Sequence, residues 1–188
     1  MIEFDHGLHE YSENGVIIPS VTQVLKRAGL IDDRFFTNDA RERGSAVHTL
    51  CERYAKGERI DNAGRFMCQL MYVGAFAEWM NKTGAYLISS ESIVSNTING
   101  KRYAGKFDGL YWIDGKRVLV DIKTGAKSRW HKMQLAAYSM AYFQDGTRVN
   151  PDKCISLYVK ADNSYRDEHF TGAELVTAID EFREALCA

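Results

Sequence analysis

An Asp-Gly dipeptide at residues 114 and 115 separates two strand-like apolar runs, 103–113 and 116–123, and it constrains the fold more than any other feature. Two-residue hairpin loops use type I′ turns, which need positive φ at both central positions and therefore favour Asp-Gly. Such a turn also sets the register, because facing residues are counted outward from it in equal steps. We expect Asp108 and Asp121 to face each other on one side of this hairpin.

A lysine joins these two carboxylates. Strand alternation returns Lys123 to the face of Asp121, while Ile122 points into the opposite layer. In a non-hydrogen-bonded antiparallel pair the Cα atoms approach to roughly 4.5 Å, where two like charges repel. A divalent cation relieves that repulsion, and Mg²⁺ takes one or two carboxylates together with water and phosphate oxygens. The alternative is a structural salt-bridge triad, but charged residues rarely occur in apolar strands without a partner or a task.

The composition narrows the class of protein. A chain of 188 residues with 45% hydrophobic content predicts one domain, 1–188, with one core. Its net charge of −1 gives no global basic signature, so a nucleic-acid contact would come from a local cluster of Lys and Arg. The four scattered cysteines include no C-x-x-C pair, which favours a reduced, cytoplasmic protein without a zinc or iron–sulfur site. No apolar run approaches the roughly 18 to 20 residues that span a bilayer, so no membrane partner is expected.

The other elements alternate between strands and helices. Besides the hairpin, the pattern predicts strands within 2–18 and at 86–95 and 155–160, and helices at 21–28, 38–56, 65–82, 128–143 and 172–187. The path from the second hairpin strand through a helix to 155–160 forms a βαβ-like unit, so the last two strands should be parallel. We therefore predict an α/β fold with a mixed central sheet flanked by helices.

The helix at 128–143 carries Gln134 and Tyr138, which are four residues apart and so lie on one side of it. The helix follows directly from the strand that ends in Lys123, and this brings the two side chains near the carboxylates; ordinary surface and core placement is the alternative. Its first turn has backbone N–H groups and a positive dipole end that favour phosphate. Basic side chains gather at the same place: Lys127, Arg129, His131 and Lys132.

His48 lies in the middle of the helix at 38–56, and a lone helical histidine is usually a packing or surface residue. Gly44, one turn earlier, costs about 1 kcal/mol relative to Ala inside a helix. This glycine therefore indicates a close approach by another element or by a ligand. Glu91, in the strand before the hairpin, is a further carboxylate for the same face, but no tight turn sets its register.

Five short motifs follow one another along the chain. They are Pro19-Ser20-Val21-Thr22, Arg43-Gly44-Ser45-Ala46-Val47-His48, Gly105-Lys106-Phe107-Asp108-Gly109, Asp121-Ile122-Lys123-Thr124 and Gln134-Leu135-Ala136-Ala137-Tyr138. In this order they resemble the PD-(D/E)XK nuclease superfamily, and within it the RecB-like exonuclease branch that includes mitochondrial genome-maintenance and phage exonucleases. The resemblance covers most of the chain and implies a restriction-endonuclease-like fold. Five ordered motifs are far more specific than a lone D-x-K tripeptide.

The resemblance also implies roles for individual residues. It implies that Mg²⁺ or Mn²⁺ is held by His48, Asp108, Asp121 and the backbone carbonyl of Ile122. Lys123 would position or activate the attacking water and stabilise the transition state, while Gln134 and Tyr138 would orient Lys123 and the DNA. Phe107 replaces the proline of the family motif, and the cysteines that form an iron–sulfur staple in some relatives are absent.

The sequence thus predicts a metal-dependent deoxyribonuclease that acts as an exonuclease on DNA ends or single strands. By resemblance, its setting would be recombination, repair or phage genome processing in a bacterial or phage-infected cell. Two alternatives stay open: a structure-specific endonuclease on the same fold, and a non-catalytic DNA-binding or assembly module. The expected partner is DNA, single-stranded or as duplex ends, and a homo-oligomer or a recombination partner protein is left open.

Overall fold

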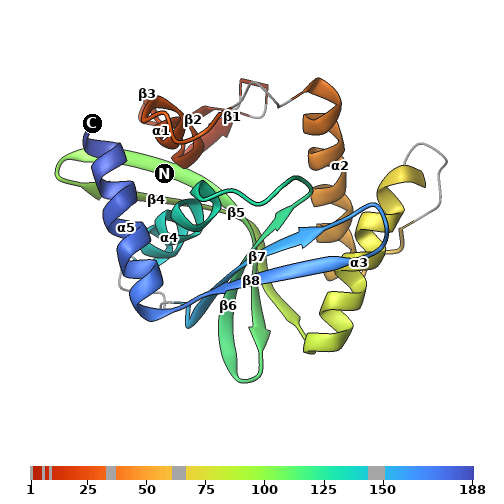
Figure 1. Ribbon diagram of the computed structural model, residues 1–188. Coiled ribbons are helices and arrows are strands. Elements are labelled where there is room, and N and C mark those ends of the chain that lie inside the picture. The colour runs from red at the N-terminus through yellow and green to blue at the C-terminus, as the bar shows by residue number, and fades with distance from the viewer. Residues whose placement is uncertain (1, 6, 9, 33–36, 61–66, 144–150) are drawn as a thin grey trace.

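The computed structural model describes residues 2–5, 7–8, 10–32, 37–60, 67–143 and 151–188 (Figure 1). The elements in chain order are β1 (Glu3–Asp5), β2 (Glu10–Glu13), β3 (Val16–Ile18), α1 (Val21–Arg27), α2 (Asn38–Ala55), α3 (Met67–Thr83), β4 (Tyr86–Ile98), β5 (Lys101–Ile113), β6 (Lys116–Lys123), α4 (Trp130–Phe143), β7 (Lys153–Val159), β8 (Tyr165–Phe170) and α5 (Gly172–Cys187). Most predicted bounds agree to within a few residues. The first two positions of the helix predicted at 65–82 lie outside the described residues.

The central sheet is mixed, as predicted. Its strand order is β4-β5-β6-β7-β8, with β6 and β7 parallel and the other neighbours antiparallel. The edge strand β8 was not predicted, because its sequence Tyr-Arg-Asp-Glu-His-Phe lacks an apolar alternation and depends on pairing with β7. β1, β2 and β3 form a separate antiparallel sheet, in which Asn14 and Gly15 make the turn between β2 and β3.

Helices cover both faces of the central sheet. Figure 1 shows α4 and α5 on one side of it and α2 and α3 on the other. The first side has a buried cluster that joins α1, α4 and α5 to β4 and β5, and the second joins α2 and α3 to β5, β6 and β7. Because both faces are covered, β6 is buried over most of its length, and its last residue, Lys123, emerges between α2 and α4. Among the described residues, no helix is both long and apolar enough to cross a bilayer.

The β5–β6 hairpin has the predicted turn and register. Asp114 and Gly115 have φ of 49° and 74°, and the pairs run from Ile113↔Lys116 outward. The ladder ends at Gly109↔Val120, however, one residue before Asp108 and Asp121, so the expectation of a direct ladder pair between the carboxylates is wrong. Just past this end of the ladder, the Ile122 amide is used by a side chain: it donates to Asp108 Oδ2 at 2.6 Å.

Candidate active site

Asp108 lies between α2 and the end of β6. One of its oxygens accepts from the Ile122 amide, and the other lies 2.9 Å from His48 Nδ1. The Asp108 side chain is 13% exposed and the His48 side chain 29%, so this pair reaches solvent at one edge. The first carboxylate therefore has two partners from two elements, and His48 on α2 does approach the hairpin as the resemblance implied.

Asp121 and Lys123 form the other half of the site. Asp121 is almost fully buried, and its Oδ2 forms an ion pair with Lys123 Nζ. None of the described residues makes a hydrogen bond of good geometry to that oxygen, although it is inaccessible to solvent. A buried carboxylate oxygen in this state is poorly satisfied, since buried charges ordinarily have full sets of hydrogen bonds. It therefore has room for a stronger electrostatic partner.

Lys123 is held by a polar chain that runs into the core. Its Nζ donates to Gln134 Oε1 at 2.7 Å, and Gln134 Nε2 donates to Tyr138 Oη at 3.0 Å and to Thr22 Oγ1 at 3.3 Å. Gln134 is buried, so both ends of its amide are used inside the protein. Thr22, on α1, stood in a recognised motif but had no predicted role; its contact depends on long-range packing that the sequence does not display.

Two glycines near the site differ in what they accommodate. A Cβ on Gly105 would lie 2.3 Å from Tyr138 Cε1, so the absent side chain is what allows the Tyr138 ring to pack on β5. A Cβ on Gly44 would lie 3.7 Å from Thr124 Oγ1, which is an ordinary contact. The close approach that the sequence indicated at Gly44 is therefore not found among the described residues, and there is space for a methyl group.

The two carboxylates have pKa shifts in opposite directions. Burial would raise the pKa of Asp108, but His48, Lys123 and the Ile122 amide together hold it below its usual value. Burial raises the pKa of Asp121, Asp108 adds to the rise, and Lys123 offsets only part of it. The pKa of His48 is raised, because Asp108 and Asp121 outweigh the effect of burial. These mutual effects indicate that both carboxylates and His48 lie within one electrostatic neighbourhood.

The basic cluster predicted at the start of α4 is largely engaged within the protein. Lys127 forms an ion pair with Glu168, and Arg129 with Glu181. His131 is buried, with its Nδ1 2.9 Å from Tyr158 Oη, and burial together with Lys123 lowers its pKa to about 3. His131 is therefore a neutral packing residue at neutral pH and not part of an exposed cationic surface.

Glu91 does not join the carboxylates. It lies between the pairs Ser90↔Gly109 and Ser92↔Phe107, has a positive φ of 49°, and forms an ion pair with Lys106. A positive φ is unusual for a non-glycine residue in a strand. The local distortion of β4 turns Glu91 toward Lys106 instead of Asp108.

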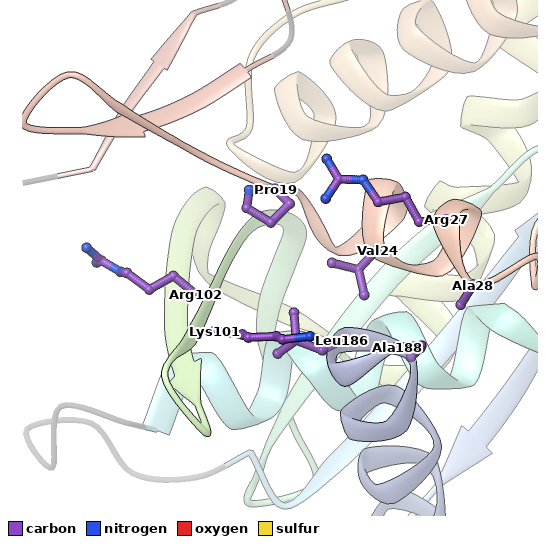
Figure 2. Close-up of a pocket in the computed structure, with 9 residues that line it drawn as sticks. Pro19, Val24, Arg27, Ala28, Lys101, Arg102, Leu186 and Ala188 are labelled. Carbon is purple, nitrogen blue, oxygen red and sulfur yellow. The ribbon is translucent and has the colours of Figure 1, made fainter.

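A cavity of about 660 Å³ opens directly beside the site, and His48, Ile122 and Lys123 belong to its wall. Other parts of the wall come from the segment between β6 and α4 and from α2. A separate cavity of about 470 Å³ lies between α1, the start of β5 and the end of α5 (Figure 2). In that second cavity Lys101 donates to the Cys187 carbonyl and Arg102 pairs with Glu13, and none of the predicted site residues contributes to it.

The donor set suits a hard divalent cation. Mg²⁺ and Mn²⁺ prefer carboxylate and carbonyl oxygens, and Mn²⁺ also accepts imidazole. Asp121 Oδ2 is a buried oxygen without a hydrogen bond of good geometry from the described residues, and Asp108 accepts from the amide of the next residue, Ile122. As they stand, no three His, Cys, Asp or Glu side chains in the described ranges are arranged to hold a metal ion, so side chains alone would supply only part of a cation's ligands.

Comparison with known proteins identifies the architecture. No protein-family model and no curated protein matches the chain. It is similar to the crystal structure of a candidate exonuclease from Eubacterium rectale, with a TM-score of 0.61 and 15% identity over 89% of this chain and 77% of that one. At this identity the likeness establishes the fold, which is a restriction-endonuclease-like mixed sheet flanked by helices.

A second solved structure, that of SSO0001, is 19% identical. The match covers 66% of this chain but only 60% of that protein, with a TM-score of 0.40. This is below the level that indicates a shared fold.

Proposed function

We propose that this protein is a Mg²⁺- or Mn²⁺-dependent deoxyribonuclease that hydrolyses phosphodiester bonds at DNA ends or in single strands. The observation that carries the proposal is the convergence of Asp108, Asp121 and Lys123 at the end of one hairpin, beside an open cavity. The candidate exonuclease from Eubacterium rectale, which has a similar architecture, supports it. The proposed setting, DNA recombination, repair or phage genome processing, rests on the sequence resemblance.

Lys123 is the residue nearest to the proposed chemistry. Its ammonium group stabilises negative charge on the phosphate in the transition state and positions the attacking water. Gln134 fixes Nζ in one place through its Oε1, and Thr22 and Tyr138 fix the Gln134 amide in turn. These three residues act on the reaction through Lys123, so they are positioning residues.

The carboxylates and His48 would hold the cation. Asp108, Asp121, His48 and the Ile122 carbonyl are its proposed ligands, and when bound it polarises the phosphate and lowers the pKa of a water. Asp108 remains oriented by the Ile122 amide, which donates to the oxygen that does not face His48. Asp121 is paired with Lys123 without the cation, so binding of the cation would compete with that pair.

The test compares the unaltered protein with Asp121→Asn and Lys123→Ala on end-labelled single-stranded, linear duplex and covalently closed circular DNA. Matched controls come from the same hairpin: Asp114→Asn and Lys116→Ala change an exposed carboxylate and an exposed lysine at its turn. Each reaction is run with Mg²⁺, with Mn²⁺ and with EDTA.

We expect metal-dependent shortening of linear DNA by the unaltered protein and both controls, and none by the two site variants. Cleavage of closed circles would replace the exonuclease proposal with an endonuclease. Absence of cleavage with either metal would overturn the proposed hydrolytic function and favour a DNA-binding or assembly module. Full activity of the Asp121 and Lys123 variants would overturn the assignment of the reaction to this site.

A further inference from the structure

The cavity beside Lys123 has an apolar part in its wall, which hydrolysis of a phosphodiester does not by itself require. Trp130, at the first turn of α4, and Leu30 contribute large apolar surfaces to it, and Leu30 is 40% exposed. The ring of Trp130 meets the His131 ring edge to face, with centroids 4.2 Å apart, and Lys123 Nζ lies 5.1 Å from its centroid. An aromatic surface is thus fixed next to the proposed reacting lysine.

The same cavity contains an arginine with unused hydrogen-bonding capacity. Arg43, on α2, lines it, and its Nε is inaccessible to solvent and has no hydrogen-bond partner among the described residues. A buried donor without an acceptor is unfavourable. The guanidinium fork matches a phosphate group better than an ammonium does, so a phosphate in the cavity would supply the missing acceptor.

We propose that this cavity binds one unpaired nucleotide next to the scissile phosphate, with its base against Trp130 and a phosphate on Arg43. A volume of about 660 Å³ lies within the range of small-ligand pockets. Lys123 Nζ lies over the Trp130 ring, so a nucleotide that adjoins the one at Lys123 is next to this ring.

The occupant is single-stranded because of what stacking requires. In a duplex both faces of a base are covered by its neighbours, and a base meets a protein ring only after it is unstacked, which costs a few kcal/mol. A strand that is already unpaired avoids this cost, and stacking on an aromatic side chain stabilises it with any of the four bases. The inference rests on the proposed nuclease function and adds to it a preference for single strands or frayed ends.

The test measures binding in EDTA, where no cleavage is expected, to a short fluorescent oligothymidylate and to versions with an abasic nucleotide at either end. Trp130→Ala should weaken binding of the intact oligonucleotide by about tenfold, because stacking contributes 1–3 kcal/mol per base. One of the two abasic oligonucleotides lacks the base that would occupy the cavity, and Trp130→Ala should not change its binding. Trp130→Phe should retain most of the affinity for the intact oligonucleotide. Trp112→Ala, which removes an exposed tryptophan from β5, is the control and should change nothing.

Arg43→Lys should weaken binding of intact and abasic oligonucleotides alike, since it contacts phosphate and not the base. Arg41→Lys is its control on the same helix, where Arg41 contacts Asn38. Thermal unfolding of each variant reports whether the change has altered the fold. Blunt duplex DNA should be bound more weakly than the single strand and respond little to Trp130→Ala.

Equal losses on intact and abasic oligonucleotides with Trp130→Ala, or no loss on either, would overturn the inference and leave Trp130 as a packing partner of Lys123. Absence of oligonucleotide binding by the unaltered protein would overturn it as well. Cleavage with Mg²⁺ is measured in parallel. Cleavage of single strands without discrimination against the abasic end would support the proposed nuclease function and contradict the nucleotide pocket. Discrimination against the abasic end without cleavage would support the pocket and contradict the nuclease function.

Discussion

The two halves of the candidate site are built on different principles. On the α2 side, Asp108 completes the hydrogen bonding of the hairpin and is paired with His48, so its charge stabilises the fold. On the α4 side, Asp121 is buried and ion-paired with Lys123, one of its oxygens receives no hydrogen bond of good geometry from the described residues, and its pKa is raised. The fold therefore favours the ionised form of Asp108 and disfavours that of Asp121.

The largest expected effect is on the proposed reaction, where the two halves should affect different kinetic quantities. Lys123→Ala should lower kcat by about 10³-fold at saturating metal, the usual loss for a transition-state electrostatic group. His48→Ala should instead raise the metal concentration that gives half-maximal rate by about tenfold to a hundredfold, with a smaller loss in kcat. Initial rates against Mg²⁺ and Mn²⁺ concentration measure both. Equal loss of kcat in both variants with unchanged metal dependence would contradict this division.

The two halves should differ in how a Gly→Ala substitution changes the free energy of unfolding. Gly105→Ala places a Cβ against Tyr138 and should lower the free energy of unfolding by about 1–3 kcal/mol, or roughly 2–4 °C in Tm per kcal/mol. Gly44→Ala meets only an ordinary contact and should raise it by about 0.5–1 kcal/mol through helix propensity. Thermal and urea unfolding measure both changes. If Gly105→Ala proves neutral, the Tyr138 ring is not confined as the structure has it.

The two histidines should give opposite dependences on pH. His131 titrates near 6.5 when unfolded and near 3 when folded, so the unfolded chain binds the extra proton and stability falls as pH drops from 6.5. The loss approaches about 1.4 kcal/mol per pH unit, and His131→Gln should remove it. The pKa of His48 is raised, so its contribution is full below about 6.5 and is lost as pH rises through the folded value. Unfolding curves against pH for each His→Gln variant test the signs, and a steeper acid loss in His131→Gln would refute the first.

The smallest expected effect concerns the carboxylates themselves. At neutral pH in EDTA, Asp108→Asn should lower the free energy of unfolding, because an ionised group that the fold favours is removed. Asp121→Asn should raise it, since the ionised form of that group is disfavoured by burial and by Asp108. Each change should be about 1 kcal/mol, as for a typical substitution. Asp114→Asn serves as the exposed control, and changes of the same sign at both sites would count against the comparison.

The structural features that depend on residues close together in the sequence were predicted. The Asp114-Gly115 turn gave the hairpin register, and the crossover helix gave the parallel pairing of β6 with β7. The end of the ladder at Gly109 was not predicted, because it depends on where the Asp108 side chain hydrogen-bonds.

The features that depend on distant partners were missed. The sequence indicated that the basic residues at the start of α4 were available to bind phosphate. Lys127 and Arg129 instead pair with Glu168 on β8 and Glu181 on α5, which are distant in the sequence. The role of Thr22 likewise depends on how α1 packs on α4.

Through the hydrogen bond from Gln134 to Thr22, the N-terminal segment helps to fix the position of Lys123. The residues just before α1 are bound near the start of β5, where Ala104 N donates to the Pro19 carbonyl at 3.0 Å. The position of the lysine is therefore set jointly by the sheet below it and by a short helix that is not part of that sheet. Anything that pulls α1 from β5 would remove one of the two hydrogen bonds that Gln134 Nε2 donates, and Tyr138 alone would then hold the amide that positions Lys123.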